Sequence, residues 1–417
     1  MSTESFIPPK MNYPLLWLMD LGIKNLLKAV HNIENVVIKE SDKENLKKLK
    51  DERVIYISNH PSTKEPPISY LVGNLMYSRF KYMASREVFD WGDGLVGDFI
   101  QQMGGFSVIA GASDRESLKM TRSILASEKG KLVLFPEGEP TGTENDNLLP
   151  FQAGVSQLGF WGYEDALKVN PKADITIVPA YVKYRMYGSK ESIRRDVDYS
   201  LEKMENYFGI SKKGKDIIHR LSSIGKRVIE RAEREFGIIP EESQTFDYRV
   251  GRLRHHILDT VAETVGLKKY NKEDHAIDKL RKILSTFEMV FVKVPDPKNE
   301  LPSMDKAKWG RKFCQRVYDF ITIGTNYLHE LPSAERIYEW IYRLENELFG
   351  KTNPRPQIAE VHFAPFFKFS ELYPDYKKDK KKAVEELTSR LRTEIQTLLD
   401  REVKNSEHLF PDGHVFF

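Results

Sequence analysis

Residues 35–184 alternate short β-branched runs with helical patterns, and this alternation limits the possible folds more than any other feature of the chain. The runs include "RVIYIS" at 53–58, "KLVL" at 131–134 and "ADITIVPAYVKY" at 173–184. Strands that alternate with helices at short spacing form layered structures around a central sheet. The sequence therefore predicts an α/β domain in this part of the chain.

From 188 to 356 the pattern changes to long, charged, amphipathic helices whose apolar residues recur every three and four positions. Strand character returns in "QIAEVHFAPFF" at 357–367, and an amphipathic helix follows at 381–403. A strand and a helix after a purely helical block indicate that the block is an insertion. We expect four segments: 1–34, an N-terminal amphipathic helix; 35–187, the α/β core; 188–356, a large all-α insertion; and 357–417, a strand and helix that complete the core.

Charge and cysteine content exclude several classes of protein. The net charge of +3 gives no indication of nucleic-acid binding. Cys314 is the single cysteine, so the chain has neither an internal disulfide nor a cysteine metal cluster, as is typical of a reducing compartment. The N-terminus lacks the features of a signal peptide. We expect a cytoplasmic protein.

The segment 11–30 predicts an amphipathic helix that carries Trp17. Charged residues interrupt it, and no stretch reaches the ~20 apolar residues that a membrane span requires. A helix of this kind can lie in a membrane interface, or it can pack its apolar side on its own domain. Periodicity does not choose between these two interpretations.

The strand at 53–58 ends on Asn59-His60, and Glu65 follows five positions after the histidine. Histidine can act as a general base at neutral pH, and a carboxylate can orient its ring and stabilise the imidazolium. The alternative is an ordinary polar loop between a strand and a helix. Spacing alone leaves both open.

Three further places follow or adjoin strands, where sites form in α/β sheets. "FPEG" at 135–138 can expose backbone N–H groups to an anion, although Pro-Glu-Gly is also a common turn. Arg115, at a predicted helix start, can grip a phosphate or can be a plain surface arginine. "IVPAYVKY" at 177–184 carries a proline, which indicates an edge or a kinked strand end.

The order of these four places resembles the glycerolipid acyltransferase superfamily, which contains the glycerol-3-phosphate and lysophosphatidate acyltransferases. That family shows Asn-His with an acidic residue five positions after the histidine, a glycine-hydrophobic block with an arginine, Phe-Pro-Glu-Gly, and a Val-Pro strand. The matching residues here are Asn59-His60 with Glu65, Gly105-Phe106-Ser107 with Arg115, Phe135-Pro136-Glu137-Gly138, and Val178-Pro179. The resemblance covers roughly 35–187 and implies a central mixed sheet flanked by helices.

The resemblance also implies a function. It suggests an O-acyltransferase of phospholipid biosynthesis that moves an acyl group directly from acyl-CoA or acyl-carrier protein to a glycerol-phosphate or lipid acceptor at a membrane surface. His60 would be the base and Glu65 would orient it, with no cofactor and no metal. The implied substrate-binding residues are Asn59, Arg115, Glu137, Gly138 and Lys183.

The sequence departs from the family pattern at three places, and these departures affect the expected identity of the acceptor more than the expected acyl-transfer reaction. The first motif has Glu65 where the family usually has aspartate, Arg115 comes later than the family arginine, and Glu139 follows Gly138 where the family often has Thr-Arg. A catalytically silent lipid-binding or scaffolding protein on the same fold is the alternative. A soluble hydrolase is disfavoured because no Gly-x-Ser-x-Gly elbow accompanies the histidine.

Overall fold

The computed structural model describes residues 6–109, 114–138, 140, 145–241, 243–296, 300–321 and 325–411. The chain divides into two compact units. Unit 1 comprises Met1–Thr141, Asn145–Tyr184 and Gln357–Lys404, and unit 2 comprises Gly142–Glu144, Arg185–Pro356 and Asn405–Phe417. Each unit is described below by itself.

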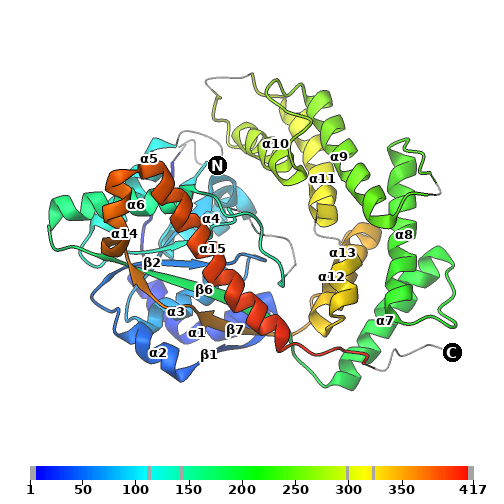
Figure 1. The fold of residues 1–417 in the computed structure, drawn as a ribbon, viewed down its shortest axis with the longest axis horizontal. Helices are drawn as coiled ribbons and strands as arrows, with labels where there is room; N and C mark the ends of the chain where they lie inside the picture. The colour runs from blue at the N-terminus through cyan, green and yellow to red at the C-terminus, as the bar shows by residue number, and fades with distance from the viewer. Residues whose placement is uncertain are drawn as a thin grey trace. The chain divides into compact units, whose positions relative to one another are not determined.

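A mixed sheet forms the centre of unit 1 (Figure 1). Its seven main strands lie in the order β1-β7-β6-β2-β5-β3-β4, and β8 pairs with β6 off this path. This confirms the predicted α/β fold with a mixed central sheet. The strands are β1 (Ile33–Ile38), β2 (Arg53–Ser58), β3 (Lys81–Ser85), β4 (Gly105–Val108), β5 (Lys131–Leu134), β6 (Ile175–Met186), β7 (Gln357–Phe363) and β8 (Phe367–Lys368).

Strand β2 lies inside the sheet, and all six of its residues are buried. It pairs in parallel with β5 on one side and with β6 on the other. A strand that is buried on both faces needs a continuous apolar run, which "RVIYIS" provides apart from its ends. The carboxyl ends of β2 and β5 therefore lie at the same edge of the sheet.

Strand β7 follows the helical segment in sequence but pairs in parallel with β1, with Val37 opposite Glu360. It lies between β1 and β6 in the sheet. Strand β8 pairs antiparallel with β6, so the sheet contains both parallel and antiparallel neighbours.

Helices cover both faces of this sheet (Figure 1). Helices α1, α2 and α3 contribute to one apolar core, and α5, α6, α14 and α15 contribute to the other. The bounds in unit 1 are α1 (Tyr13–His31), α2 (Glu40–Lys47), α3 (Glu65–Leu75), the 3₁₀ segment η1 (Arg86–Gly94), α4 (Leu95–Gln102), α5 (Arg115–Ala126), α6 (Gly154–Val169), α14 (Phe369–Lys378) and α15 (Lys380–Lys404).

Unit 2 is built from helices packed around an apolar core of their own. The buried Arg220 of this unit is paired with a carboxylate: it binds Glu205 through two nitrogens at 2.8 and 2.7 Å. The helices are α7 (Lys190–Phe208), α8 (Ile217–Glu235), α9 (Phe246–Val265), α10 (Ala276–Phe291), α11 (Met304–Ile321), α12 (Thr325–Glu330) and α13 (Ala334–Phe349).

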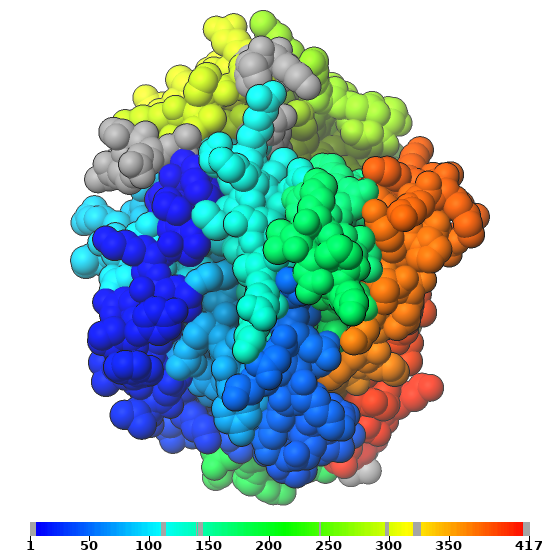
Figure 2. All heavy atoms as spheres, turned by 90° about the vertical axis from the view of Figure 1, so that its left-hand side faces the viewer, coloured from blue at the N-terminus to red at the C-terminus, as the bar shows by residue number. Residues whose placement is uncertain are grey.

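Helix α1 begins after Asn12, whose side chain caps it by accepting a hydrogen bond from the backbone of Leu15. Its buried face packs on the sheet, while Trp17, Leu18 and Leu21 are exposed. Figure 2 shows the N-terminal segment, in dark blue, at the surface. None of the helices in the described ranges is both long enough and apolar enough to cross a membrane.

Candidate active site

The loop between β2 and α3 carries the first predicted motif. Asn59 follows the last residue of β2, and its side chain is 1% exposed. Its amide nitrogen donates to the carbonyl of Val182 at 3.1 Å, and the backbone nitrogen of Val182 donates to its amide oxygen at 2.7 Å. Both ends of the amide are thus used by β6. Asn59 fixes the start of the loop against the neighbouring strand.

His60 and Glu65 are in direct contact. His60 Nδ1 lies 2.8 Å from Glu65 Oε2, and the His60 ring stacks on Phe135 with centroids 4.2 Å apart and planes 17° apart. An ionised carboxylate only accepts hydrogen bonds, so Nδ1 is the donor in this contact, and in the neutral imidazole Nε2 then carries the lone pair. Within the described ranges no hydrogen bond to Nε2 occurs. The histidine is therefore oriented on one side and available on the other.

Glu65 is nearly fully buried, with 1% exposure, and is the first residue of α3. Besides His60, its carboxylate accepts hydrogen bonds from the Ser62 backbone and hydroxyl, both at 3.0 Å, and from the Tyr184 hydroxyl. A helix N-terminus also favours negative charge. These hydrogen bonds fix the position of the Glu65 carboxylate beside the imidazole.

Tyr184 is a residue whose part in the site is not evident from the sequence. Burial, followed by the nearby charge of Glu65, raises the pKa of its hydroxyl well above the ordinary value, so it remains a donor at neutral pH. The pairing of β2 with β6 places Ser58 opposite Ala180. Because side chains alternate along a strand, that register would have pointed to Tyr184, but register is not readable from the sequence.

Glu137, in the turn that follows β5, connects this turn to the loop that carries His60. Its side chain is fully buried; Oε1 accepts from the His60 backbone nitrogen and Oε2 from the Leu149 backbone nitrogen, each at 2.7 Å. Burial raises the pKa of this carboxyl to about 7, against the two backbone hydrogen bonds, which lower it. Glu137 therefore positions the backbone of the histidine.

Gly138, directly after Glu137, lies close to the side chain of Gln152, with no room for a side chain of its own. Its φ of +82° is one that side chains rarely adopt, and a Cβ atom there would come within 1.8 Å of Gln152 Nε2. Gln152 Nε2 donates to the Glu137 carbonyl at 3.2 Å. A glycine is required so that this glutamine can brace the turn.

Arg115 and Lys183 lie apart from the contacts that hold His60. Arg115 is the first residue of α5 and is exposed, and the described part of the chain offers its side chain no hydrogen bond or ion pair. Lys183 forms an ion pair with Asp146 in which both side chains have no exposed area. This burial argues against direct contact between Lys183 and a substrate.

Comparison with known proteins identifies the domain that carries this site. Residues 37–183 match the family model described as Acyltransferase. This part of the chain is an Acyltransferase-family domain, which confirms the resemblance found in the motifs. The match indicates an enzyme of the transferase kind, with an acyl donor and an acceptor. The chain has no match among the curated proteins.

Proposed function

We propose that this protein transfers a fatty acyl group from acyl-CoA or acyl-carrier protein to a hydroxyl of a glycerol-phosphate or lysophosphatidate-class acceptor. One observation carries the proposal: within an Acyltransferase-family domain, His60 Nδ1 is held by the buried Glu65 while no described residue bonds to Nε2. A silent scaffold would have no need to keep a buried carboxylate on this imidazole. The scaffold alternative therefore remains only as an outcome of the test below.

In the proposed reaction His60 Nε2 removes the proton of the acceptor hydroxyl as its oxygen attacks the thioester carbonyl carbon. The resulting imidazolium is stabilised by Glu65 through Nδ1–H. The tetrahedral intermediate then collapses, the C–S bond breaks, and the thiolate leaves with the proton from Nε2. The acyl group passes directly from sulfur to oxygen, without an acyl-enzyme. Tyr184 and Ser62 hold Glu65, and so act as positioning residues.

Two predicted substrate-binding residues take a positioning role in this proposal. The amide of Asn59 and the carboxylate of Glu137 are both fully engaged by protein backbone. They orient the loop that carries His60, and Gly138 allows the turn after β5 to close. Lys183, paired with Asp146, supports the sheet.

Arg115 is the proposed binding group for an acidic headgroup on the acceptor. It is exposed at the N-terminus of a helix of 12 residues, where a backbone dipole also attracts anions. Arginine binds phosphate bidentately, and Arg115 has no described partner that would compete. An Arg115→Ala variant should raise KM for a phosphorylated acceptor more than it changes kcat.

The proposed acceptor is a lipid, and α1 offers a surface for docking peripherally on a membrane. The exposed fractions of Trp17, Leu18 and Leu21 are 64%, 64% and 85%. The segment before α1 adjoins the end of α4, where the Asn12 backbone donates to Gln102 at 3.0 Å, and α4 exposes Leu95 by 75%. Exposed apolar groups with tryptophan on an amphipathic helix are typical of interfacial binding.

Product mass spectrometry tests the proposed function. Wild-type protein and His60→Ala would be incubated with acyl-CoA or acyl-carrier protein and a panel of glycerol-3-phosphate, lysophospholipids and simple alcohols. We expect a new acylated product from the wild type only, and its mass names the acceptor. No product from the wild type, or equal product from the variant, would contradict the proposal and favour the scaffold.

A further inference from the structure

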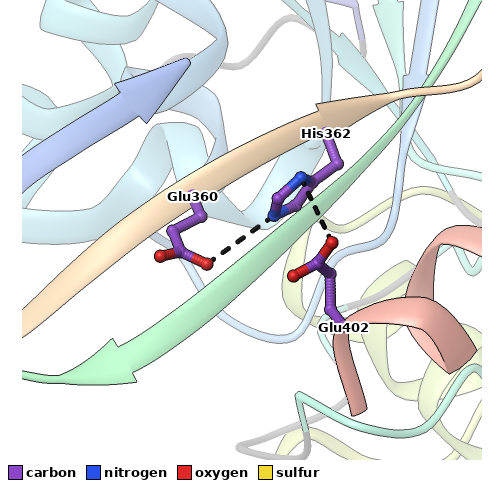
Figure 3. Close-up of side chains that lie close together, drawn as sticks. All are labelled: Glu360, His362 and Glu402. Carbon is purple, nitrogen blue, oxygen red and sulfur yellow. Dashed lines mark ion pairs between the residues drawn. The ribbon is translucent and has the colours of Figure 1, made fainter. Parts of the chain in front are cut away.

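A second group of ionisable side chains lies in unit 1, on strand β7 and helix α15. Glu360 and His362 are two residues apart on β7, so their side chains leave the same face of the strand. Glu402 lies in the last turn of α15, on the buried side of that helix. Figure 3 shows the imidazole between the two carboxylates, one from its own strand and one from the helix.

His362 is 8% exposed, and neither of its ring nitrogens has a hydrogen-bond partner among the residues that the structure describes. Nε2 lies 3.7 Å from Glu360 Oε2, and Nδ1 lies 3.5 Å from Glu402 Oε1. These separations are longer than the 2.7–2.9 Å typical of charge-assisted hydrogen bonds. A buried polar ring left without partners is costly, and each such group in a folded protein calls for an explanation.

The three side chains match the donor set of a divalent metal ion. One ligand atom from each residue can be chosen so that all lie within 4.8 Å of one another. Tetrahedral bonds of 2.0–2.2 Å to nitrogen and oxygen would separate neighbouring ligand atoms by roughly 3.3 Å. An ion binds only one ring nitrogen, and each nitrogen has a carboxylate oxygen near that separation: Glu360 at 3.7 Å from Nε2, and Glu402 at 3.5 Å from Nδ1. Two carboxylates would also balance the charge of the ion.

We propose that Glu360, His362 and Glu402 bind a divalent transition-metal ion of the Zn²⁺ class. Imidazole with carboxylates suits zinc better than it suits magnesium or calcium, which prefer all-oxygen sites. The ion satisfies one ring nitrogen of His362, and water completes its coordination. Bound there, it ties the end of α15 to β7.

The side chain of Arg401 competes for part of this site. Arg401 Nε donates to Glu402 Oε1 at 2.9 Å, and its side chain is 47% exposed. A carboxylate has two oxygens and several lone pairs, so this contact and a metal bond can coexist. The rival occupant of the site is a proton: a charged imidazolium held between the two carboxylates would need no metal.

The site is independent of the proposed acyl transfer, because it shares no residue with the His60 contacts. Its test is calorimetric titration of the chelator-treated full-length protein with Zn²⁺, together with thermal unfolding at each Zn²⁺ concentration. We expect one ion per chain and a melting temperature that rises with Zn²⁺. His362→Gln should weaken binding at least tenfold and remove the thermal shift.

His219→Gln is the matched control, since His219 also contacts a carboxylate but is 75% exposed. It should bind Zn²⁺ as the wild type does. If His362→Gln does not fold, Glu360→Gln removes a ligand that is 29% exposed and should weaken binding in the same way. Absence of saturable binding by the wild type, or unchanged binding by both site variants, would overturn the metal site. The metal-free alternative, a His362 imidazolium between the two carboxylates, would then be favoured.

Discussion

Two histidines contact a carboxylate through Nδ1 at almost the same distance, in two different regions of the molecule. His60 lies 2.8 Å from Glu65 at the edge of the sheet, and His219 lies 2.9 Å from Asp216 at the start of α8. The side chains of the first pair are 13% and 1% exposed, and those of the second are 75% and 32% exposed. The distance alone therefore does not distinguish the proposed catalytic pair from a pair at the surface.

The difference lies in what surrounds each pair. Glu65 accepts hydrogen bonds from Ser62 and Tyr184 as well as from the histidine, and the His60 ring rests on Phe135. Asp216 serves as the cap of α8, accepting from the His219 backbone nitrogen at 2.8 Å. The first carboxylate is held in place by donors and orients a ring, whereas the second ends a helix.

The largest expected difference is in catalysis by Glu65 variants. Glu65→Gln should lower kcat/KM about 10²–10⁴-fold, because the neutral amide no longer stabilises the imidazolium. Glu65→Asp keeps the charge with a shorter reach and should retain more activity than Glu65→Gln. Asp216→Asn is the matched control and should keep wild-type rates. Equal activity of Glu65→Gln and Asp216→Asn in steady-state assays would remove the distinction between the two pairs.

Tyr184→Phe keeps the Glu65 carboxylate and removes one of the hydrogen bonds that hold it in place. A hydrogen bond to a charged group contributes about 1.5–3 kcal/mol. If part of this is lost in the transition state, we expect a fall of about tenfold in kcat with little change in KM. An unchanged kcat would mean that the Tyr184 hydroxyl does not help to position Glu65.

Glu137 should give unit 1 a characteristic pH dependence of stability. Its pKa is raised from the ordinary value of 4.5 to about 7, so the folded state binds this proton more tightly than the unfolded chain does. The stabilisation is present below about pH 4.5 and is lost as the pH rises to about 7. Urea unfolding of Glu137→Gln between pH 5 and about 8 should lack this decline. The same slope in wild type and variant would contradict the assignment.

Asp216 should give a pH dependence of stability that is opposite in sign to that of Glu137 and smaller in size. Burial would raise its pKa, but hydrogen bonds from the His219 backbone and ring outweigh burial and hold it below the ordinary value. Its stabilisation is therefore present above the ordinary pKa and is lost as the pH falls through the lowered one. Asp216→Ala should cost about 1 kcal/mol at neutral pH, the usual loss for a helix cap, and leave acyl transfer unchanged. A loss of activity would show that this pair is more than a cap.

Local patterns in the sequence were sufficient for the α/β fold and for the His60–Glu65 pair. The apolar run 53–58 is a buried strand, and the five-residue spacing leads from its end to the first residue of a helix, as predicted. Tyr184 was missed because its place depends on the register between β2 and β6. The helix expected at 381–403 is α15, and α14 before it was not foreseen, because its own Pro374 argues against a helix.

The contacts of the expected binding residues were harder to predict than the contact between His60 and Glu65. Lys183 sits in β6, the strand that carries the last motif, and nothing in the sequence shows that Asp146 lies beside it in a buried pair. Asn59 and Glu137 were expected at the substrate, whereas their polar groups bond to the backbone of distant segments. Such partners are brought together by the fold and not by sequence spacing.

The most direct test of the account compares His60→Ala with His219→Ala in steady-state acyl transfer, using the acceptor identified by product mass. The account predicts that His60→Ala lowers kcat/KM at least 100-fold, in line with loss of a general base, while His219→Ala keeps the wild-type value. Both variants should unfold at wild-type temperature to within a few degrees. Equal rates for the two variants would contradict the claim that His60 is the base.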